Sequence, residues 1–201
     1  DSALLISSGP AYLGQGLKTS LRVQGVSFQK IKSSPSYPVS TIYDSDVFFD
    51  RIVIQDSVGT GARGLVLGNR SYITVDRSHF QDNDITNQGL GLLWASNSEL
   101  NVRNSTFSNN TGGGVLFHTE GRGSVFYSTF AGNINYNVVV AISAHSPTII
   151  SNNLFTDTDN AASVYVHRDE EGGSSVHNNL FYESVGGFVN GRRLHGNVST
   201  L

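Results

Sequence analysis

Residues 147–158 read PTIISNNLFTDT, and residues 175–184 read SVHNNLFYES. Both stretches contain Asn-Asn-Leu-Phe after an apolar residue, and the two copies lie 26 residues apart. The same frame extends through seven windows, whose Phe position, the anchor, holds Phe28, Ile54, Phe80, Phe107, Phe130, Phe155 and Phe181. The position five before the anchor holds Val23, Phe49, Val75, Val102, Val125, Ile150 and Val176. Two apolar columns with a period of 23 to 27 residues identify an internal repeat.

Within each window, apolar and polar residues alternate over short runs, as at Ile73 and Val75 or at Leu100 and Val102. This period of two is typical of β-strands, and no window carries an extended helical pattern. We therefore predict an all-β fold, a right-handed single-stranded parallel β-helix of about seven to eight coils with about three short strands each. Each coil takes 23–27 residues, and residues 1–201 are expected to form one such domain.

A third column, two positions before the anchor, changes from apolar to polar along the chain. It begins with Val26 and Ile52 and continues with Ser78, Ser105, Ser128, Asn153 and Asn179. Asn tolerates the left-handed backbone conformation, which suits a sharp bend between strands. Side chains stacked about 4.8 Å apart also hydrogen-bond to one another and to the next coil. We interpret the column as a partial asparagine ladder with a structural role.

Composition argues against two classes of function. The 201 residues carry a net charge of −3, and 14% are charged without a basic stripe, which argues against nucleic-acid binding. No apolar run approaches about 18 residues, so no membrane insertion is expected within this segment. The chain has no Cys, but stacked coils do not require disulfides, so this absence leaves the redox compartment open.

The two ends of the sequence carry no recognisable capping pattern, and position 1 is Asp rather than Met. Uncovered ends of a β-solenoid expose strand edges that pair with other strands. We therefore expect a segment of a larger chain. Its end coils are expected to stack on other domains of that chain or on neighbouring subunits.

Four Asn-X-Ser/Thr sequons occur at turn-like positions, at Asn69, Asn104, Asn109 and Asn197. They fit an N-glycosylated surface, and the charge content is low. Together these features favour a protein that is extracellular or at the cell surface.

Outward side chains that align between coils are the candidate sites of such a fold. Four positions before the anchor, Asp50 and Asp76 are neighbours and are followed by Arg103. An acid pair beside an Arg resembles the carboxylates and base of polysaccharide-cleaving β-helices. The alternative is a charge ladder, in which the acids pair across coils with Arg51 and Arg77. The sequence favours the charge ladder and leaves Asp50, Asp76 and Arg103 as the alternative catalytic set.

A second outward column, two positions after the anchor, contains Asp56, Asp82, Asp157 and Glu183. Exposed carboxylates about 5 Å apart repel by only about 1 kcal/mol in water, so the column requires no cation. Calcium accepts several oxygen ligands and is the alternative cofactor at these positions. No other cofactor is expected.

Other residues give less specific signals. The HRDEE segment at 167–171 is typical of a solvated turn. The remaining histidines fall at different phases without metal-ligand spacing, at His79, His118, His145 and His195. Three aromatic residues are candidate sugar-stacking side chains, Trp94, Tyr127 and Tyr182. Packing explains Trp94 equally well, and no G-x-S-x-G elbow, P-loop or zinc motif occurs.

The N-terminal half resembles the β-helix region of the fibrocystin family and of related cell-surface hyaluronidase-type proteins. The resemblance rests on an ordered set, V-x-G-V-x-F at 23–28, Tyr-Pro-Val at 37–39, I-x-x-S at 54–57 and a further strand at 75–80. The hyaluronan-degrading relatives typically carry H-F-H after the Tyr-Pro turn, whereas this chain has Ser40, Thr41 and Ile42. These side chains cannot replace imidazoles in proton transfer or metal binding, so the resemblance implies a non-catalytic member. The F-x-x-N segments FQDN, FSNN and FAGN are also similar to repeats of polymorphic outer-membrane proteins.

We therefore predict a structural or adhesive β-helix module of a larger extracellular or cell-surface glycoprotein, without catalytic activity. One alternative is a polysaccharide-cleaving or epimerising β-helix enzyme. The other is a carbohydrate-binding module that uses an outward coil face. Both alternatives have polysaccharide as their partner.

Overall fold

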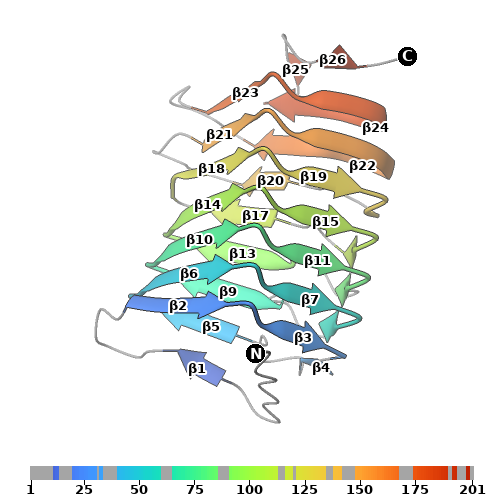
Figure 1. The fold of residues 1–201 in the computed structure, drawn as a ribbon. Coiled ribbons are helices and arrows are strands. Elements are labelled where there is room, and N and C mark those ends of the chain that lie inside the picture. The colour runs from blue at the N-terminus through green and yellow to red at the C-terminus, as the bar shows by residue number, and fades with distance from the viewer. Residues whose placement is uncertain are drawn as a thin grey trace.

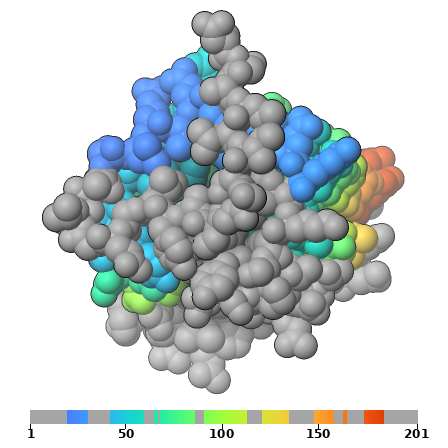
Figure 2. Space-filling view, turned by 90° about the horizontal axis from the view of Figure 1, so that it is seen from below, coloured from blue at the N-terminus to red at the C-terminus, as the bar shows by residue number. Residues whose placement is uncertain are grey.

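The computed structural model describes residues 11–13, 20–30, 32–33, 40–59, 65–85, 91–112, 116–119, 121–134, 138–141, 148–167, 174–189, 192–193 and 198–199. Within these ranges the chain forms strands and turns without a helix, and hence without a helical membrane span. Strands of successive coils pair in parallel, one coil above the next (Figure 1). The predicted all-β parallel β-helix is confirmed. Viewed along the axis from the N-terminal end, the coils lie one behind another (Figure 2).

A seven-stranded parallel sheet, sheet B, forms one wall of the solenoid. Its strands in order are β2 (Ser20–Gln24), β6 (Asp46–Asp50), β10 (Tyr72–Asp76), β14 (Glu99–Arg103), β18 (Gly123–Phe126), β21 (Thr148–Ser151) and β23 (Ser175–His177). Each of these strands belongs to a different coil. Sheet B therefore places one outward row of side chains from every coil on a common surface.

The remaining walls belong to a 15-stranded sheet and a four-stranded sheet. The stack that follows sheet B contains β3 (Ser27–Gln29), β7 (Val53–Gln55), β11 (His79–Gln81), β15 (Thr106–Ser108) and β19 (Thr129–Ala131). The stack that precedes sheet B contains β1 (Ala11–Leu13), β5 (Ser40–Tyr43), β9 (Val66–Asn69), β13 (Leu93–Ser96), β17 (Leu116–Thr119) and β20 (Val138–Ala141). Both stacks continue into β22 (Leu154–His167) and β24 (Leu180–Val189), which makes them one sheet. Strand β24 also pairs with β25 (Arg192–Arg193) and β26 (Val198–Ser199).

The N-terminal coils contain four strands rather than the three expected. The additional strands are only two residues long, β4 (Lys32–Ser33), β8 (Val58–Gly59), β12 (Asp84–Ile85) and β16 (Thr111–Gly112). A two-residue strand contains too little alternation to stand out in a sequence.

The observed register aligns the two apolar columns of the repeat. On sheet B, Val75 pairs with Phe49 on one side and Val102 on the other. In the next stack, Phe80 pairs with Ile54 and Phe107. Each position therefore falls at the same place in consecutive coils.

Aromatic stacking fills the core of the coils from Phe80 onward. The buried rings of Phe80, Phe107, Phe130, Phe155 and Phe181 lie nearly parallel, with successive centroids 4.8, 4.9, 4.9 and 5.0 Å apart. Their spacing follows from the distance between paired strands. Burial of one such ring contributes about 1.5–3 kcal/mol, and each aromatic pair about 0.5–1.5 kcal/mol more.

A left-handed residue followed by a ladder residue forms each sharp corner. Between sheet B and the next stack, Arg51 has a φ of 54° and Arg77 a φ of 49°. The Arg51 N–H still donates to the Asp76 carbonyl of the next coil at 3.0 Å. The following N–H, that of Ile52, is accepted instead by the Ser78 hydroxyl at 3.2 Å. The ladder side chain therefore accepts the one backbone N–H that does not take part in strand pairing at the corner.

In the C-terminal coils, asparagine fills both positions of this corner. Asn152, with a φ of 57°, makes the bend, while Asn153 is the ladder residue. Asn153 donates from its backbone N and from Nδ2 to Asn179 Oδ1, both at 3.0 Å. The left-handed geometry expected of the ladder column thus belongs to the residue before it. The paired asparagines of the repeat therefore have two different roles.

Candidate functional site

Two carboxylates on the outward side of sheet B are surrounded by arginine. Asp50, at the end of β6, has no exposed surface. Its Oδ2 lies 3.0 Å from Arg22 Nη2, and its Oδ1 lies 2.7 Å from Arg77 Nη2. Arg51 Nε adds a third cation at 3.6 Å from Oδ2. Because the arginines remain about half exposed, they form a lid over the carboxylate.

The protonation state of Asp50 follows from this enclosure. Burial raises the pKa of the carboxyl group, but hydrogen bonds and positive charge from Arg22 and Arg77, with the charge of Arg51, outweigh burial. The net effect holds the pKa of Asp50 below its ordinary value. A general acid requires a proton near neutral pH, and a general base requires access to substrate. Asp50 meets neither requirement.

The ion pairs continue into the next coil through Asp76. Arg103 Nη2 lies 3.3 Å and Arg77 Nε 3.6 Å from Asp76 Oδ2. The amide of Asn104 donates to Asp76 Oδ1 at 3.0 Å. The structure thus brings together the three residues of the alternative catalytic set, and it places them in ion pairs that cross from coil to coil.

The carboxylates of the second outward column all lie at left-handed corner positions. Asp56, Asp82, Asp157 and Glu183 have φ between 47° and 53° and are exposed. The first two accept hydrogen bonds from neighbouring glutamines, at 3.4 Å for Asp56 and 2.8 Å for Asp82. Across the part of the chain that the structure describes, no group of three or more His, Cys, Asp or Glu is arranged to hold a metal ion. Calcium binding stays a prediction without structural support.

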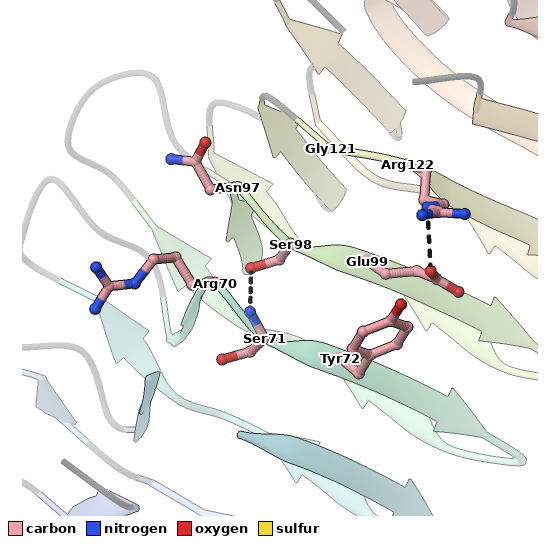
Figure 3. A pocket seen from close by; sticks show the side chains of 8 residues that line it. All are labelled: Arg70, Ser71, Tyr72, Asn97, Ser98, Glu99, Gly121 and Arg122. Carbon is pink, nitrogen blue, oxygen red and sulfur yellow. Dashed lines mark hydrogen bonds and ion pairs between the residues drawn. The ribbon is translucent and has the colours of Figure 1, made fainter. Parts of the chain in front are cut away.

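A polar cleft lies where the strands of sheet B begin (Figure 3). It has a volume of about 280 Å³. Tyr72 and Glu99 pair in register between β10 and β14, and Arg122 lies at the matching place before β18. Arg70 and Asn97 occupy the left-handed corners before these strands, with φ of 49° and 48°. Three successive coils therefore contribute to one surface depression.

Hydrogen bonds and ion pairs fix the cleft. On its floor, the backbone N–H of Ser71 donates to the Ser98 hydroxyl at 3.1 Å. Glu99 Oε1 accepts from the Asn101 amide at 2.9 Å, and Glu99 Oε2 lies 3.4 Å from Arg122 Nε. In Figure 3, Arg70 and Asn97 lie on one side of the two serines, and Tyr72, Glu99 and Arg122 lie on the other.

The three candidate sugar-stacking residues do not form one platform. Trp94 is half-buried on β13, and its buried indole Nε1 has no hydrogen-bond partner within the described part of the chain. Tyr127 occupies the corner after β18 with 66% of its surface exposed. Tyr182 lies exposed on β24, where a hydrogen bond with Glu183 and the charge of that carboxylate, with smaller effects of burial and Asp157, raise the pKa of its hydroxyl.

The sequons differ in their surroundings. Asn109 is exposed at a left-handed corner. Asn104 is exposed too, but its Nδ2, the atom that would carry a glycan, is bonded to Asp76. Asn69 is half-buried at the end of β9. Asn197, the segment 168–171 and the side chains of His118, His145, His167 and His195 lie outside the described residues.

Two further ladders and the cleft were not predicted from the sequence. The first ladder joins the backbone N–H of each residue to the side chain of the next coil, through Ser57, Asn83, Asn110 and Asn133. Its signal is the F-x-x-N spacing at 80–83, 107–110 and 130–133. The second runs through Ser45, Ser71 and Ser98, at the corner that also forms the floor of the cleft. Its members stand seven residues before Ile52, Ser78 and Ser105, the residues of the column two positions before the anchor.

The chain belongs to a family described as the right handed beta helix region, whose model matches residues 24–198. This finding agrees with the predicted handedness. The family description names no substrate or activity. A comparison with curated proteins gives no match.

Solved structures with similarity are distant. One is a mutant tailspike protein of E. coli bacteriophage HK620 in complex with a pentasaccharide, at 10% identity and a TM-score of 0.30, covering 93% of this chain and 50% of that chain. Another is QnrB1, a plasmid-mediated fluoroquinolone resistance protein, at 12% identity and a TM-score of 0.24, covering 99% of this chain and 91% of that chain. The chain spans about half the length of the tailspike. Similarity at this level carries no argument about function.

Proposed function

We propose that this chain is a structural or adhesive, non-catalytic β-helix module of a larger extracellular or cell-surface glycoprotein. The observation that carries the proposal is the enclosure of Asp50, which has no exposed surface and lies against three arginines. Asp76 is likewise held by Arg77 and Arg103. These carboxylates hold successive coils together, which leaves the adhesive role to other outward side chains.

The extracellular location is supported by the exposed sequon residue Asn109 and by the low charge content. The resemblance of residues 23–80 to the fibrocystin family supports the same location. In this proposal the end coils contact other domains of the parent chain or neighbouring subunits, because strand edges at a solenoid end favour pairing. No calcium is required.

The second candidate is a carbohydrate-binding module, and the polar cleft at Tyr72 and Arg122 favours it. Adhesion to polysaccharide at this cleft unites the two candidates. A polysaccharide-cleaving enzyme is disfavoured, since its carboxylates would have to leave their arginine partners to reach a substrate.

The test is a panel of neutral and acidic polysaccharides, with and without calcium, in which binding and the release of new chain ends are measured together. We expect binding of at least one polysaccharide without turnover. Reproducible turnover that disappears in the triple variant Asp50→Asn, Asp76→Asn and Arg103→Gln, with folding unchanged, would favour the enzyme instead. A folded protein that binds no member of the panel would contradict polysaccharide adhesion.

A further inference from the structure

We propose that the cleft formed by Arg70, Tyr72, Asn97 and Arg122 binds a sugar residue that carries a carboxylate. The inference rests on the proposed adhesive function and names its ligand class and site. At about 280 Å³, the cleft lies near the lower limit for small-molecule sites, which suits one sugar residue of a chain. Its position on an outward corner leaves the rest of a polysaccharide free to extend along sheet B.

The unused polar groups of the cleft are mainly donors. Both carboxylate oxygens of Glu99 are already engaged, by the Asn101 amide and by Arg122 Nε. The terminal nitrogens of Arg122 have no partner among the described residues, and the side chain is 65% exposed. Arg70 contacts Asp44 at 2.7 Å through one terminal nitrogen, which leaves its other donors unpaired within the same described part of the chain. A ligand that fits must supply acceptors.

Carboxylate is the acceptor that fits a guanidinium group best, because two parallel N–H donors match its two oxygens. Each guanidinium group already faces one carboxylate, Asp44 for Arg70 and Glu99 for Arg122, so the preference for an anion rests on their terminal donors without a partner among the described residues. Glu99 contacts Arg122 through Nε at 3.4 Å, on the inner side of the guanidinium, and the terminal nitrogens are directed toward the contact with a ligand carboxylate.

Tyr72 supplies the apolar part of the site. Its ring is 53% exposed on a rigid strand, beside the Glu99 and Arg122 side chains (Figure 3). An exposed aromatic ring offers a flat surface to the C–H face of a sugar and a hydroxyl at its tip. The amide of Asn97, across the cleft, is exposed and supplies a further donor to ring hydroxyls.

The experiment titrates the protein with short oligomers of galacturonate, of mannuronate and guluronate, and of hyaluronan. Each oligomer is compared with its carboxyl-reduced form, which keeps the linkage but lacks the charge. Calorimetry gives the affinity, and NMR signals of the Tyr72 ring report the location. We expect at least one acidic oligomer to bind, with at least a tenfold weaker affinity for its reduced form.

Substitutions locate the site. Arg122→Gln and Tyr72→Val should each weaken binding at least tenfold, and Tyr72→Phe should retain most of it. Arg103→Gln is the matched control, because Arg103 lies on the same sheet, is about half exposed and has an ion pair of similar length, 3.3 Å against 3.4 Å. This variant should bind as the wild type does. Unfolding midpoints confirm that all variants fold.

Three results would overturn the inference. Equal affinities for an acidic oligomer and its reduced form would show that the ligand's carboxylate does not contribute to binding, but they would leave the adhesive function intact. Binding that survives Arg122→Gln and Tyr72→Val would place the site elsewhere, again without harm to the adhesive function. If no acidic oligomer binds, the cleft inference is wrong, and the binding of neutral polysaccharides in the first panel decides separately about adhesion.

Discussion

The N-terminal and C-terminal coils share one interior but have different exteriors. All seven ion pairs recorded among the described residues involve positions 22 to 122. Among the residues that the structure describes, the exposed large apolar side chains after that point are Tyr127, Ile134, Ile149, Leu180 and Tyr182, against Tyr72 alone before it. The outward column that holds Asp50 and Asp76 in the first coils continues with Phe126 and Ser151 in later ones.

The ladders change together with the exterior. Serine hydroxyls accept the corner N–H groups of the early coils, as Ser105 does for Ser78 at 3.1 Å. Asparagine replaces serine at Asn153 and Asn179 and adds side-chain bonds between coils. At this corner the early coils are therefore joined by single hydroxyl contacts and the late coils by an amide ladder. At the following corner an amide ladder is already present in the early coils, where Asn83 Nδ2 donates to Asn110 Oδ1 at 2.9 Å. The inward columns therefore determine the fold, while the outward columns are free to vary.

The largest expected effect comes from charging an inward column. Val102 is fully buried on β14 between Val75 and Val125. Replacement by Asp buries an unpaired charge and should lower the free energy of unfolding by about 4 kcal/mol or more. Thr106→Asp, at an outward, half-buried position of β15, is the control and should cost about 1 kcal/mol or less. Urea denaturation measures the loss of stability in both variants. Equal losses would contradict the assignment of Val102 to the inward column.

The next largest effect is a pH dependence of stability that arises from the ion pairs of the N-terminal coils. Because the folded-state pKa of Asp50 is lowered, its carboxylate stabilises the native state above its unfolded pKa of about 4, and this contribution is lost as pH falls through the lower folded pKa. The wild-type urea midpoint should therefore fall in this acid window. In Asp50→Asn, the midpoint should be lower at pH 7 and should depend less on pH. Asp46→Asn, at an exposed position of the same strand, should keep the wild-type pH dependence, and the same dependence in both variants would contradict the account.

The ladders give a direct comparison between the two regions. Asn153→Ala removes the acceptor of the Ser128 N–H and the donor to the Val125 carbonyl, both buried, and should cost about 3 kcal/mol. Ser105→Ala removes the acceptor of the Ser78 N–H and one donor, and should cost about 1–2 kcal/mol. Chemical denaturation of the two variants tests the order. A larger loss for the serine variant would show that the amide ladder adds nothing.

The smallest effect should be a gain in stability. Tyr127 has a φ of 51°, a conformation that is unfavourable for a bulky residue by about 1 kcal/mol. The same corner position holds Asn152 and Asn178 in the next coils. Tyr127→Asn should therefore raise the free energy of unfolding by about 0.5–1 kcal/mol, as measured by thermal and urea unfolding. A loss would mean that packing against Phe126, with centroids 6.2 Å apart, outweighs the backbone strain.

The interior was predictable from the sequence because burial demands apolar residues at a fixed phase. Val102 and Phe107 fall in the predicted columns for this reason. The cleft was not predictable, since it combines Arg70 with Arg122 across coils whose loop lengths vary. Tyrosine ordinarily avoids the left-handed region, so only the repeat alignment, which places Tyr127 in one column with Asn152 and Asn178, indicates its backbone conformation.

Hydrogen exchange of individual strands at neutral and acid pH, followed by mass spectrometry, tests whether the outward carboxylates of the first coils are structural. Exchange is corrected for its slower intrinsic rate in acid, and β6 and β10 are compared with β21 and β23. We predict that acid removes protection from β6 and β10 around Asp50 while β21 and β23 keep theirs. Equal protection of all four strands in acid would contradict the account and would leave these carboxylates available for chemistry.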